Sequence, residues 1–292
     1  MLIKIRCRKN LLYLFIYYLS ALINNNIVGG LLFFIFSRFD PLYICIFFYP
    51  FENIIGGLIV FLYQKYSVGK KEKAKYFGIN LIHNKKNISK DGKLKKILLI
   101  FFASFFNYYG FIIRKFYKAK YISVFMECRL SSIQIIISTL IFFYSFGFKM
   151  KKHHKASLII ISISFFLLIS TDIIFFVYYN YKNIKVPLFQ YFITIFHYIG
   201  YSFNDCIEKY LVDNNYMNPF IILMIEGIFE LAMALLSMIW IDPFEGLNKL
   251  KSGENKTGAI FVFILYTLLQ VIVNIYRIYC NVIYSPIARS LQ

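Results

Sequence analysis

The stretch that decides the fold is residues 259–284, which read AIFVFILYTLLQVIVNIYRIYCNVIY. The segment holds one charged residue, Arg277, and neither Gly nor Pro. A helix needs about 20 mostly apolar residues to cross the hydrocarbon core of a bilayer. We therefore predict a transmembrane helix over these residues.

The rest of the 292-residue chain has a similar composition. Hydrophobic residues make up 59% of it and charged residues 16%, and its mean hydropathy is +0.61. Soluble proteins carry about 25% charged residues. The apolar runs are continuous, as expected for transmembrane helices. The strands of a membrane β-barrel would instead alternate between apolar and polar residues. The composition excludes a soluble enzyme, a disordered chain and a coiled coil.

The predicted fold is an all-α, polytopic bundle of transmembrane helices in a single membrane domain, residues 1–292. A basic, Gly-containing stretch at 64–96 predicts a flexible cytosolic loop. The segment RKFYKAK at 114–120, at the junction of the third and fourth spans, puts four cations on the predicted non-cytosolic side. Eight spans are expected, at 11–36, 41–63, 97–116, 121–145, 156–179, 187–207, 218–240 and 259–284.

The net charge of +19 comes mostly from short segments between the apolar runs, so we expect the lipid bilayer and not nucleic acid as partner. One side of the predicted topology collects 20 Lys and Arg residues and the other collects 10. This excess predicts a cytosolic N-terminus. It leaves the organelle open among endomembrane, vacuole- or lysosome-like and plastid membranes. The five cysteines form no CxxC pair, so we expect small buried side chains and no metal site or cofactor.

Polar residues inside these runs recur at steps of three and four, which places them on one face of a helix. In the last run they are Thr267, Gln270, Asn274, Arg277 and Asn281; in the sixth they are Gln190, Thr194, His197, Tyr201, Asn204 and Glu208. The seventh run has Glu226, Glu230, Met233 and Ser237; the fourth has Glu127, Ser131, Gln134 and Ser138; the third has Asn107 and Arg114.

One interpretation of these stripes is hydrogen bonding between packed helices, at about 0.6 kcal/mol per contact. Carboxylates and arginines cost about 2.5–3.5 kcal/mol each at the centre of a span, so their repeated use favours a polar cavity. The predicted substrate-cavity residues are Asn107, Glu127, Arg129, Gln134, His197, Tyr201, Asn204, Glu226, Glu230, Gln270, Asn274 and Arg277.

Several individual residues keep more than one interpretation. A hydrogen-bonded structural role for His197 is favoured over a proton relay. Glu208, with Asp205 and Lys209, fits a solvated helix end as well as a functional site. Pro50 with Gly56 and Gly57 predicts a kinked second helix whose partners approach closely.

Enzymatic motifs are absent from the sequence, and we expect a protein that is not an enzyme. The four histidines form no H-x-x-H or H-x-x-x-H box. There is also no G-x-S-x-G, P-loop or H-E-x-x-H motif.

Two stretches resemble the drug/metabolite transporter superfamily. Residues 123–170, SVFMECRLSSIQIIISTLIFFYSFGFKMKKHHKASLIIISISFFLLIS, include Arg129 and Ser131 at a helix start and a short basic connection to the next helix. Residues 208–230, EKYLVDNNYMNPFIILMIEGIFE, are similar to the link between helices six and seven of the nucleotide-sugar-transporter-like solute carrier 35 group, F branch. The matching residues are Glu208, Lys209, Asn215, Pro219, Glu226, Gly227 and Phe229.

The resemblance implies ten helices in two inverted five-helix repeats, with an EamA-like substrate site near the membrane midplane between them. Residues 11–179 would form the first repeat and 187–292 an incomplete second one. Arg289, Ser290 and Leu291 echo Arg129, Leu130 and Ser131, as expected if a ninth helix opens at 285–292. The family pattern would then need two more helices after Gln292.

The leading functional hypothesis is a secondary transporter that moves a small organic solute by alternating access. A nucleotide sugar, an amino acid or peptide, and an organic cation or drug all remain candidates, and a proton is a candidate coupling ion. The alternative is a non-transporting membrane scaffold or assembly factor. The sequence leaves the oligomeric state open.

Overall fold

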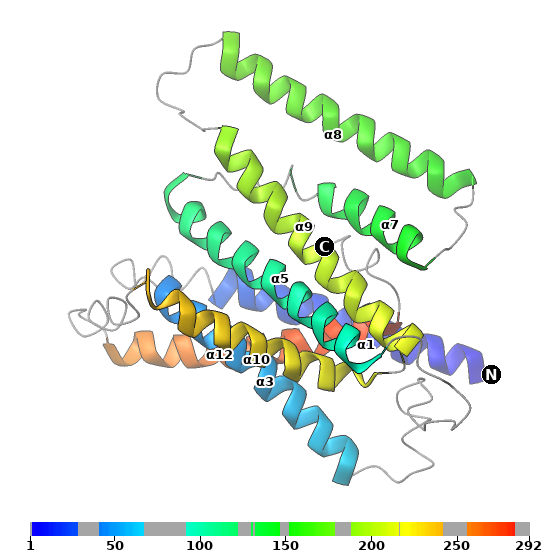
Figure 1. The fold of residues 1–292 in the computed structure, drawn as a ribbon, viewed down its shortest axis with the longest axis vertical. Helices are drawn as coiled ribbons and strands as arrows, with labels where there is room; N and C mark the ends of the chain where they lie inside the picture. Colours follow the sequence, from blue (N-terminus) through cyan, green and yellow to red (C-terminus); the bar gives the residue numbers. More distant parts are fainter. Residues whose placement is uncertain are drawn as a thin grey trace. The chain divides into compact units, whose positions relative to one another are not determined.

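The computed structural model describes residues 2–28, 41–66, 92–121, 130, 132–146, 152–178, 188–215, 217–241 and 256–283. These residues form helices and contain no strand, which confirms the all-helical prediction for this part of the chain. The elements, shown in Figure 1, are α1 (Leu2–Leu22), the π-helical η1 (Ile23–Val28), α3 (Pro41–Tyr66), α5 (Lys93–Tyr121), α7 (Ser132–Phe146), α8 (Lys152–Tyr178), α9 (Leu188–Asn215), α10 (Pro219–Ser237) and α12 (Lys256–Ile283).

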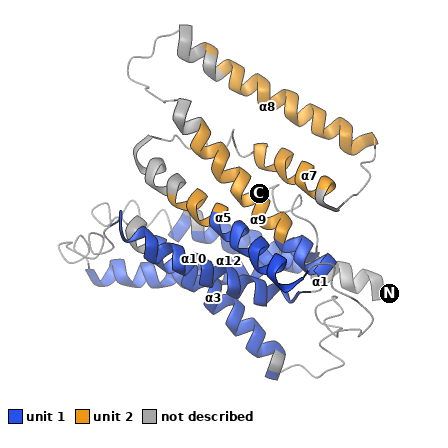
Figure 2. Ribbon diagram, viewed as in Figure 1, with its two compact units in different colours: residues 1–105, 208–285, 292 blue, residues 106–207, 286–291 orange. Residues whose placement is uncertain are grey.

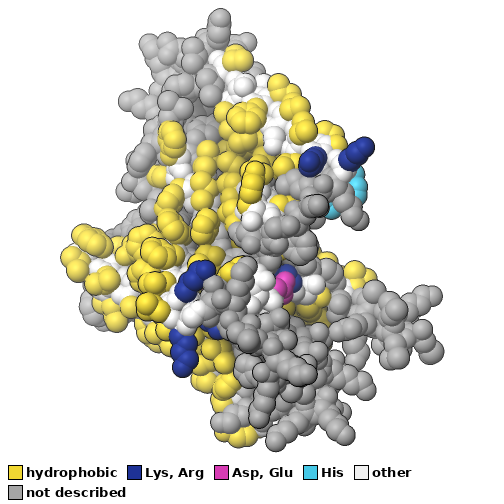
Figure 3. Space-filling model, turned by 45° about the vertical axis from the view of Figure 1, so that its right-hand side comes forward, with side chains coloured by type: hydrophobic (Ala, Val, Ile, Leu, Met, Phe, Trp, Pro, Cys, Tyr) yellow, Lys and Arg dark blue, Asp and Glu magenta, His cyan; other side chains and the backbone are white. Residues whose placement is uncertain are grey.

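Five helices within the described ranges are long and apolar enough to cross a membrane: α3, α5, α8, α10 and α12. Their most apolar windows have mean hydropathies between 1.2 and 2.2. On the face drawn in Figure 3, hydrophobic side chains cover most of the described surface and charged ones are few. Apolar side chains exposed along long helices are suited to lipid rather than to water. The chain is therefore built as a helical membrane protein.

The basic segment at 114–120 is helical. Helix α5 continues unbroken to Tyr121, while its part suited to crossing a membrane is Lys93–Ile112, so this segment follows the apolar span. Lys and Arg are good helix formers, and no Gly or Pro interrupts residues 111–121. Of the predicted loop at 64–96, the two ends belong to α3 and α5, while residues 67–91 lie outside the described residues.

The chain divides into two compact units, coloured separately in Figure 2. Unit 1 comprises residues 1–105, 208–285 and 292, and unit 2 comprises residues 106–207 and 286–291. Helices α5 and α9 each contribute to both units. Unit 1 contains residues from both halves of the expected inverted repeat. The repeat itself stays a prediction.

Unit 1 is built around α12 and the pair α3–α10, which pack closely because of two glycines. Helix α12 contacts α1, η1, α3 and α10. A Cβ atom on Gly57 of α3 would lie 2.7 Å from the carbonyl oxygen of Phe220, and one on Gly227 of α10 would lie 2.8 Å from that of Pro50. Neither contact leaves room for a side chain. The predicted close approach at Gly57 is confirmed, and Pro50 lies inside the helix.

Glycines also allow a close approach between α5 and α9 in unit 2. A Cβ atom on Gly200 would lie 2.6 Å from the carbonyl oxygen of Phe106, and one on Gly110 would lie 3.3 Å from Cα of His197. Helix α8 contrasts with this pair because most of its apolar side chains are exposed, although Phe165 is buried against Leu130 and Tyr198. Ile160 and Phe166 are 64% and 66% exposed. We assign α8 a lipid-facing role on that basis.

Candidate functional site

Helix α10 presents two carboxylates on its buried face. Asn218 caps its start, because the side-chain oxygen accepts a hydrogen bond from the backbone N–H of Phe220 at 2.9 Å, and Pro219 occupies the first helical position. The helix then runs without interruption, so Glu226 and Glu230 lie one turn apart on the same side. Both are buried, with at most 1% of either residue exposed.

Helix α12 carries the matching polar stripe. Asn274, Arg277 and Asn281 are all buried, as the spacing of three and four predicted. The apolar side chains on the other faces of α12, such as Phe261 and Leu268, are exposed. The polar face therefore points into unit 1 and the apolar face points away from it.

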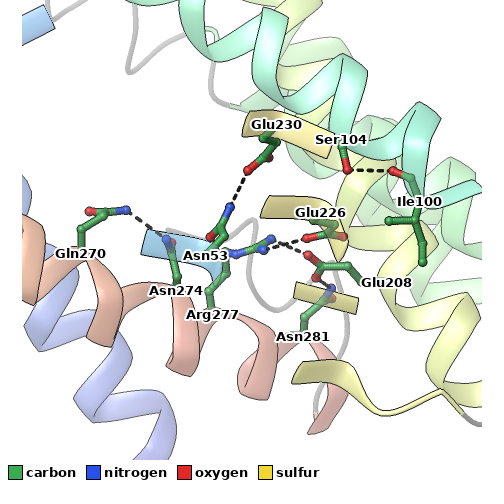
Figure 4. Close-up of polar contacts among 10 residues, drawn as sticks. All are labelled: Asn53, Ile100, Ser104, Glu208, Glu226, Glu230, Gln270, Asn274, Arg277 and Asn281. Carbon is green, nitrogen blue, oxygen red and sulfur yellow. Dashed lines mark hydrogen bonds and ion pairs between the residues drawn. The ribbon is translucent and has the colours of Figure 1, made fainter. Parts of the chain in front are cut away.

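A buried ionic cluster forms where α9, α10 and α12 meet in unit 1 (Figure 4). We define this ionic cluster as Glu208, Glu226, Arg277 and Asn281. Nη1 of Arg277 lies 2.7 Å from Oε1 of Glu208, and Nη2 lies 3.5 Å from Oε2 of Glu226. Nδ2 of Asn281 donates to Oε2 of Glu208 at 2.7 Å. The guanidinium of Arg277 therefore interacts with the carboxylates of both Glu208 and Glu226.

The charges in the ionic cluster are removed from water almost completely. The exposed fraction of the side chain is 4% for Arg277, 0% for Glu208 and 1% for Glu226. Taking such groups out of water costs several kcal/mol per ion, and mutual attraction offsets this only with good geometry. The short Arg277–Glu208 pair has that geometry, whereas the longer pair with Glu226 is weaker.

A second polar group, the amide cluster, lies nearer the start of α12. It consists of Asn24, Asn53, Glu230, Gln270 and Asn274. Nδ2 of Asn24, in η1, donates to Oε1 of Gln270, and Nε2 of Gln270 donates to Oδ1 of Asn274 at 3.4 Å. Nδ2 of Asn53, in α3, donates to Oε2 of Glu230 at 2.7 Å. The first two bonds join η1 to α12, and the third, which is a separate contact, joins α3 to α10.

Lys209 links the C-terminal part of α9 to the last turn of α12. Its Nζ donates to the carbonyl oxygen of Val282 and forms an ion pair with Asp213 at 3.2 Å. A cation in this place satisfies a carbonyl of the last helical turn. The solvated-end interpretation of Glu208 is wrong, because both it and Lys209 are buried here.

The predicted cavity residues of unit 2 form a separate group. Asn107, His197 and Asn204 are buried, and the rings of His197 and Tyr201 lie 5.1 Å apart between centroids. The backbone carbonyl of Gln134, rather than its side chain, accepts a hydrogen bond from Ser202 at 3.3 Å. The bond between Ser202 and Gln134 joins α9 to α7 within unit 2, whereas His197 and Tyr201 both belong to α9.

The structure thus brings together five of the twelve predicted cavity residues in unit 1. These are Glu226, Glu230, Gln270, Asn274 and Arg277. Asn107, Gln134, His197, Tyr201 and Asn204 belong to unit 2, while Glu127 and Arg129 lie outside the described residues.

Four residues of the two clusters were not selected from the sequence. Glu208 and Asn281 do continue the polar stripes of their helices, so their spacing was a usable signal. Asn53 and Asn24 give no such signal. Asn53 follows Glu52 but has glycines, not polar residues, three and four positions later, and Asn24 lies in the π-helical turn.

Comparison with protein-family models, with curated proteins and with solved structures finds no match for this chain. The resemblance to the drug/metabolite transporter superfamily therefore stays a prediction from the quoted motifs.

Proposed function

We propose that this chain is a secondary carrier that moves a small organic solute across a membrane by alternating access. The ionic cluster of Glu208, Glu226, Arg277 and Asn281 is the observation that carries the proposal. Three helices of unit 1 each bring a charged side chain to one buried place. Ionisable residues inside membrane proteins mark pathways for substrates, ions and protons.

Stability alone gives little reason for such a cluster. Replacing a buried ion pair by packed hydrophobic residues is often neutral or stabilising, by about 1–4 kcal/mol. Hydrophobic residues would also insert into the bilayer more readily than Glu and Arg do. The charges are better explained by a ligand that needs them.

The charge balance favours a cationic or zwitterionic solute over a nucleotide sugar. Arg277 already contacts two carboxylates, so an anionic group would have to compete with both. A cationic group would instead meet surplus negative charge. Oε1 of Glu226 has no hydrogen-bond partner among the described residues and suits an ammonium donor. A proton on this carboxylate is the candidate coupling ion.

The finer topology belongs to the same proposal: eight spans, a cytosolic N-terminus and a ten-helix inverted repeat. The sequons at Asn87 and Asn255 would lie on opposite sides of the membrane. In a glycosylating endoplasmic-reticulum system, only Asn255 should be modified. Glycosylation of Asn87 instead would invert the topology.

A non-transporting scaffold is the second candidate, and one observation favours it. The hydrogen bonds and ion pairs described for the ionic cluster run between its own members, as in a network that only holds helices together. The two candidates differ in whether solute crosses the membrane, which a transport assay decides.

The test is counterflow in proteoliposomes that contain the purified full chain. Vesicles are preloaded with unlabelled amino acids, dipeptides, organic cations or nucleotide sugars, and uptake of the labelled solute is followed. We expect counterflow of a cationic or zwitterionic solute, its loss in Glu226→Gln, and its retention in Asp213→Asn, which alters a carboxylate on the exposed part of α9. A folded protein that moves none of these solutes would favour the scaffold.

A further inference from the structure

Helix α8 begins with four consecutive basic side chains, all of them exposed. We define this basic surface as Lys152, His153, His154 and Lys155. Among the described residues, neither lysine has an ion-pair partner. No Asp or Glu occurs in the sequence between Glu127 and Asp172, so no acid close in sequence balances the lysine charges. The positive charge of the basic surface is therefore available to a group outside the chain.

The last turn of α7 lies beside the basic surface. The rings of Phe143 on α7 and His154 on α8 have centroids 6.0 Å apart, and those of His153 and His154 lie 4.2 Å apart. Tyr144, the neighbour of Phe143, is 84% exposed. Tyr and Trp are enriched where transmembrane helices pass through the headgroup region of a bilayer. The exposed tyrosine therefore indicates that the basic surface lies at the membrane–water interface.

The rest of α8 offers apolar side chains to lipid. The part suited to crossing a membrane, Lys152–Thr171, has a mean hydropathy of 1.7, and Ile159, one turn after Lys155, is 58% exposed. In Figure 3, histidine side chains lie next to Lys or Arg side chains, with hydrophobic side chains on the surface beside them. A phospholipid whose acyl chains contact the apolar part of α8 would hold its headgroup at the basic surface.

The charge of the basic surface is extended by the sequence before it. Lys149 and Lys151 precede Lys152, so four lysines fall within residues 149–155. Clusters of this size next to a transmembrane helix attract anionic lipid headgroups. A zwitterionic headgroup gains less from the lysines, because it brings a positive charge of its own.

We propose that the basic surface binds the headgroup of an anionic phospholipid, such as phosphatidylserine, whose acyl chains lie along α8. The ammonium groups of Lys152 and Lys155 attract the negative charge, and the imidazole rings have N–H groups that can donate to phosphate oxygens. The binding does not depend on the proposed transport, since a scaffold would hold the same lipid. Failure of the carrier hypothesis therefore leaves this proposal intact.

The test uses tryptophan fluorescence, because the chain has a single tryptophan, Trp240. Ile159→Trp in a Trp240→Phe background puts the fluorophore on the helix face of Lys155. The full chain is reconstituted in phosphatidylcholine that contains either phosphatidylserine or phosphatidylcholine with brominated acyl chains, and quenching gives the relative affinity of the two lipids. We expect phosphatidylserine to bind about fivefold more tightly there, which corresponds to about 1 kcal/mol. Equal affinity would refute the proposal.

The unsubstituted chain provides a matched control at another place. Trp240 is 75% exposed, and no Lys or Arg occurs in the sequence between Lys209 and Lys249. We expect phosphatidylserine and phosphatidylcholine to quench Trp240 about equally. The same preference for phosphatidylserine at both reporters would overturn the proposal, because the net charge of the chain and not the basic surface would then attract the lipid.

Two variants of the Ile159→Trp reporter assign the preference to the lysines. Lys152→Gln with Lys155→Gln should remove it, whereas Lys152→Arg with Lys155→Arg keeps the charge and should retain it. If the glutamine pair does not fold, raising NaCl from about 0.1 M to about 1 M on the parent reporter serves instead, because salt screens exposed charges. A preference for phosphatidylserine that survives the loss of both lysines, or high salt, would contradict binding through charge.

Discussion

Two sets of buried contacts, one in each unit, differ in what they bond to. In unit 1, Arg277 bonds to Glu208 and Asn53 bonds to Glu230, side chain to side chain across helices. In unit 2, Ser202 donates to the backbone carbonyls of Gln134 and Tyr198, and the thiol of Cys206 reaches that of Ser138. Neutral hydrogen bonds of this kind commonly stabilise the packing of membrane helices against one another.

The bonding partners of buried polar groups distinguish helices that only pack from helices that carry a function better than mean hydropathy does. Helices α8 and α10 have similar mean hydropathies, 1.7 and 2.1 in their best windows. Helix α8 exposes most of its apolar side chains, while α10 buries two carboxylates against α3 and α12. A span that buries charge where an apolar residue would insert more readily is the better candidate for a functional element.

Removing the cation of the ionic cluster should have the largest effect. Arg277→Met leaves Glu208 and Glu226 buried beside no guanidinium, so the free energy of unfolding should fall by about 3–5 kcal/mol. The measurement is an SDS titration of the purified protein in mixed micelles, followed by circular dichroism. A loss below about 1 kcal/mol would show that the two carboxylates do not depend on Arg277.

A neutral version of the same cluster tests whether charge serves function rather than folding. Adding Glu208→Gln and Glu226→Gln to Arg277→Met removes the stranded charges and should recover most of the lost stability. Transport should stay absent in this triple variant. Recovery of both properties together would contradict a role of the ionic cluster in solute binding.

The two units should lose similar stability when a side chain is added at their closest helix contacts, because both rely on glycine there. Gly227→Ala in unit 1 and Gly200→Ala in unit 2 each place a Cβ atom against backbone, so each should lower the free energy of unfolding by about 3 kcal/mol. Gly110→Ala, with a looser contact at 3.3 Å, should cost less. Equal losses in all three variants would mean that these distances do not govern stability.

The sequence predicted polar faces better than it predicted partners. The spacing of Asn274, Arg277 and Asn281 is a property of one helix, and a period of 3.6 residues fixes their common side. The pairing of Arg277 with Glu208 depends on how α9 meets α12, which local spacing does not encode. The periodicity did not single out Asn53, because Gly56 and Gly57 stand where a polar stripe would continue.

The basic residues at 114–120 show a different limit of the sequence. They follow the apolar span Lys93–Ile112, but Lys and Arg also favour helix and no Gly or Pro is present, so α5 continues through them. Charge predicts where a helix leaves the hydrocarbon core, but it does not predict where the helix ends. The division into two units within α5 and α9 has no counterpart in composition, because each helix is continuous across it.

Removing a neutral donor to the ionic cluster should have an intermediate effect. Asn281→Ala deletes the hydrogen bond to the buried carboxylate of Glu208, and we expect a loss of about 2 kcal/mol in the free energy of unfolding. A double-mutant cycle with Glu208→Gln isolates the energy of this one bond. Additive effects in that cycle would contradict the contact.

The smallest effect is expected in unit 2, where the hydroxyl of Ser202 bonds to backbone. Ser202→Ala removes that bond from a helix interface, and the expected loss is about 0.6 kcal/mol, the average for hydrogen bonds between membrane helices. The alanine fits the same space, so packing should not change. If this loss equalled that of Asn281→Ala, the contrast between the ionic cluster of unit 1 and the Ser202 contact of unit 2 would fail, because backbone and carboxylate acceptors would then contribute alike.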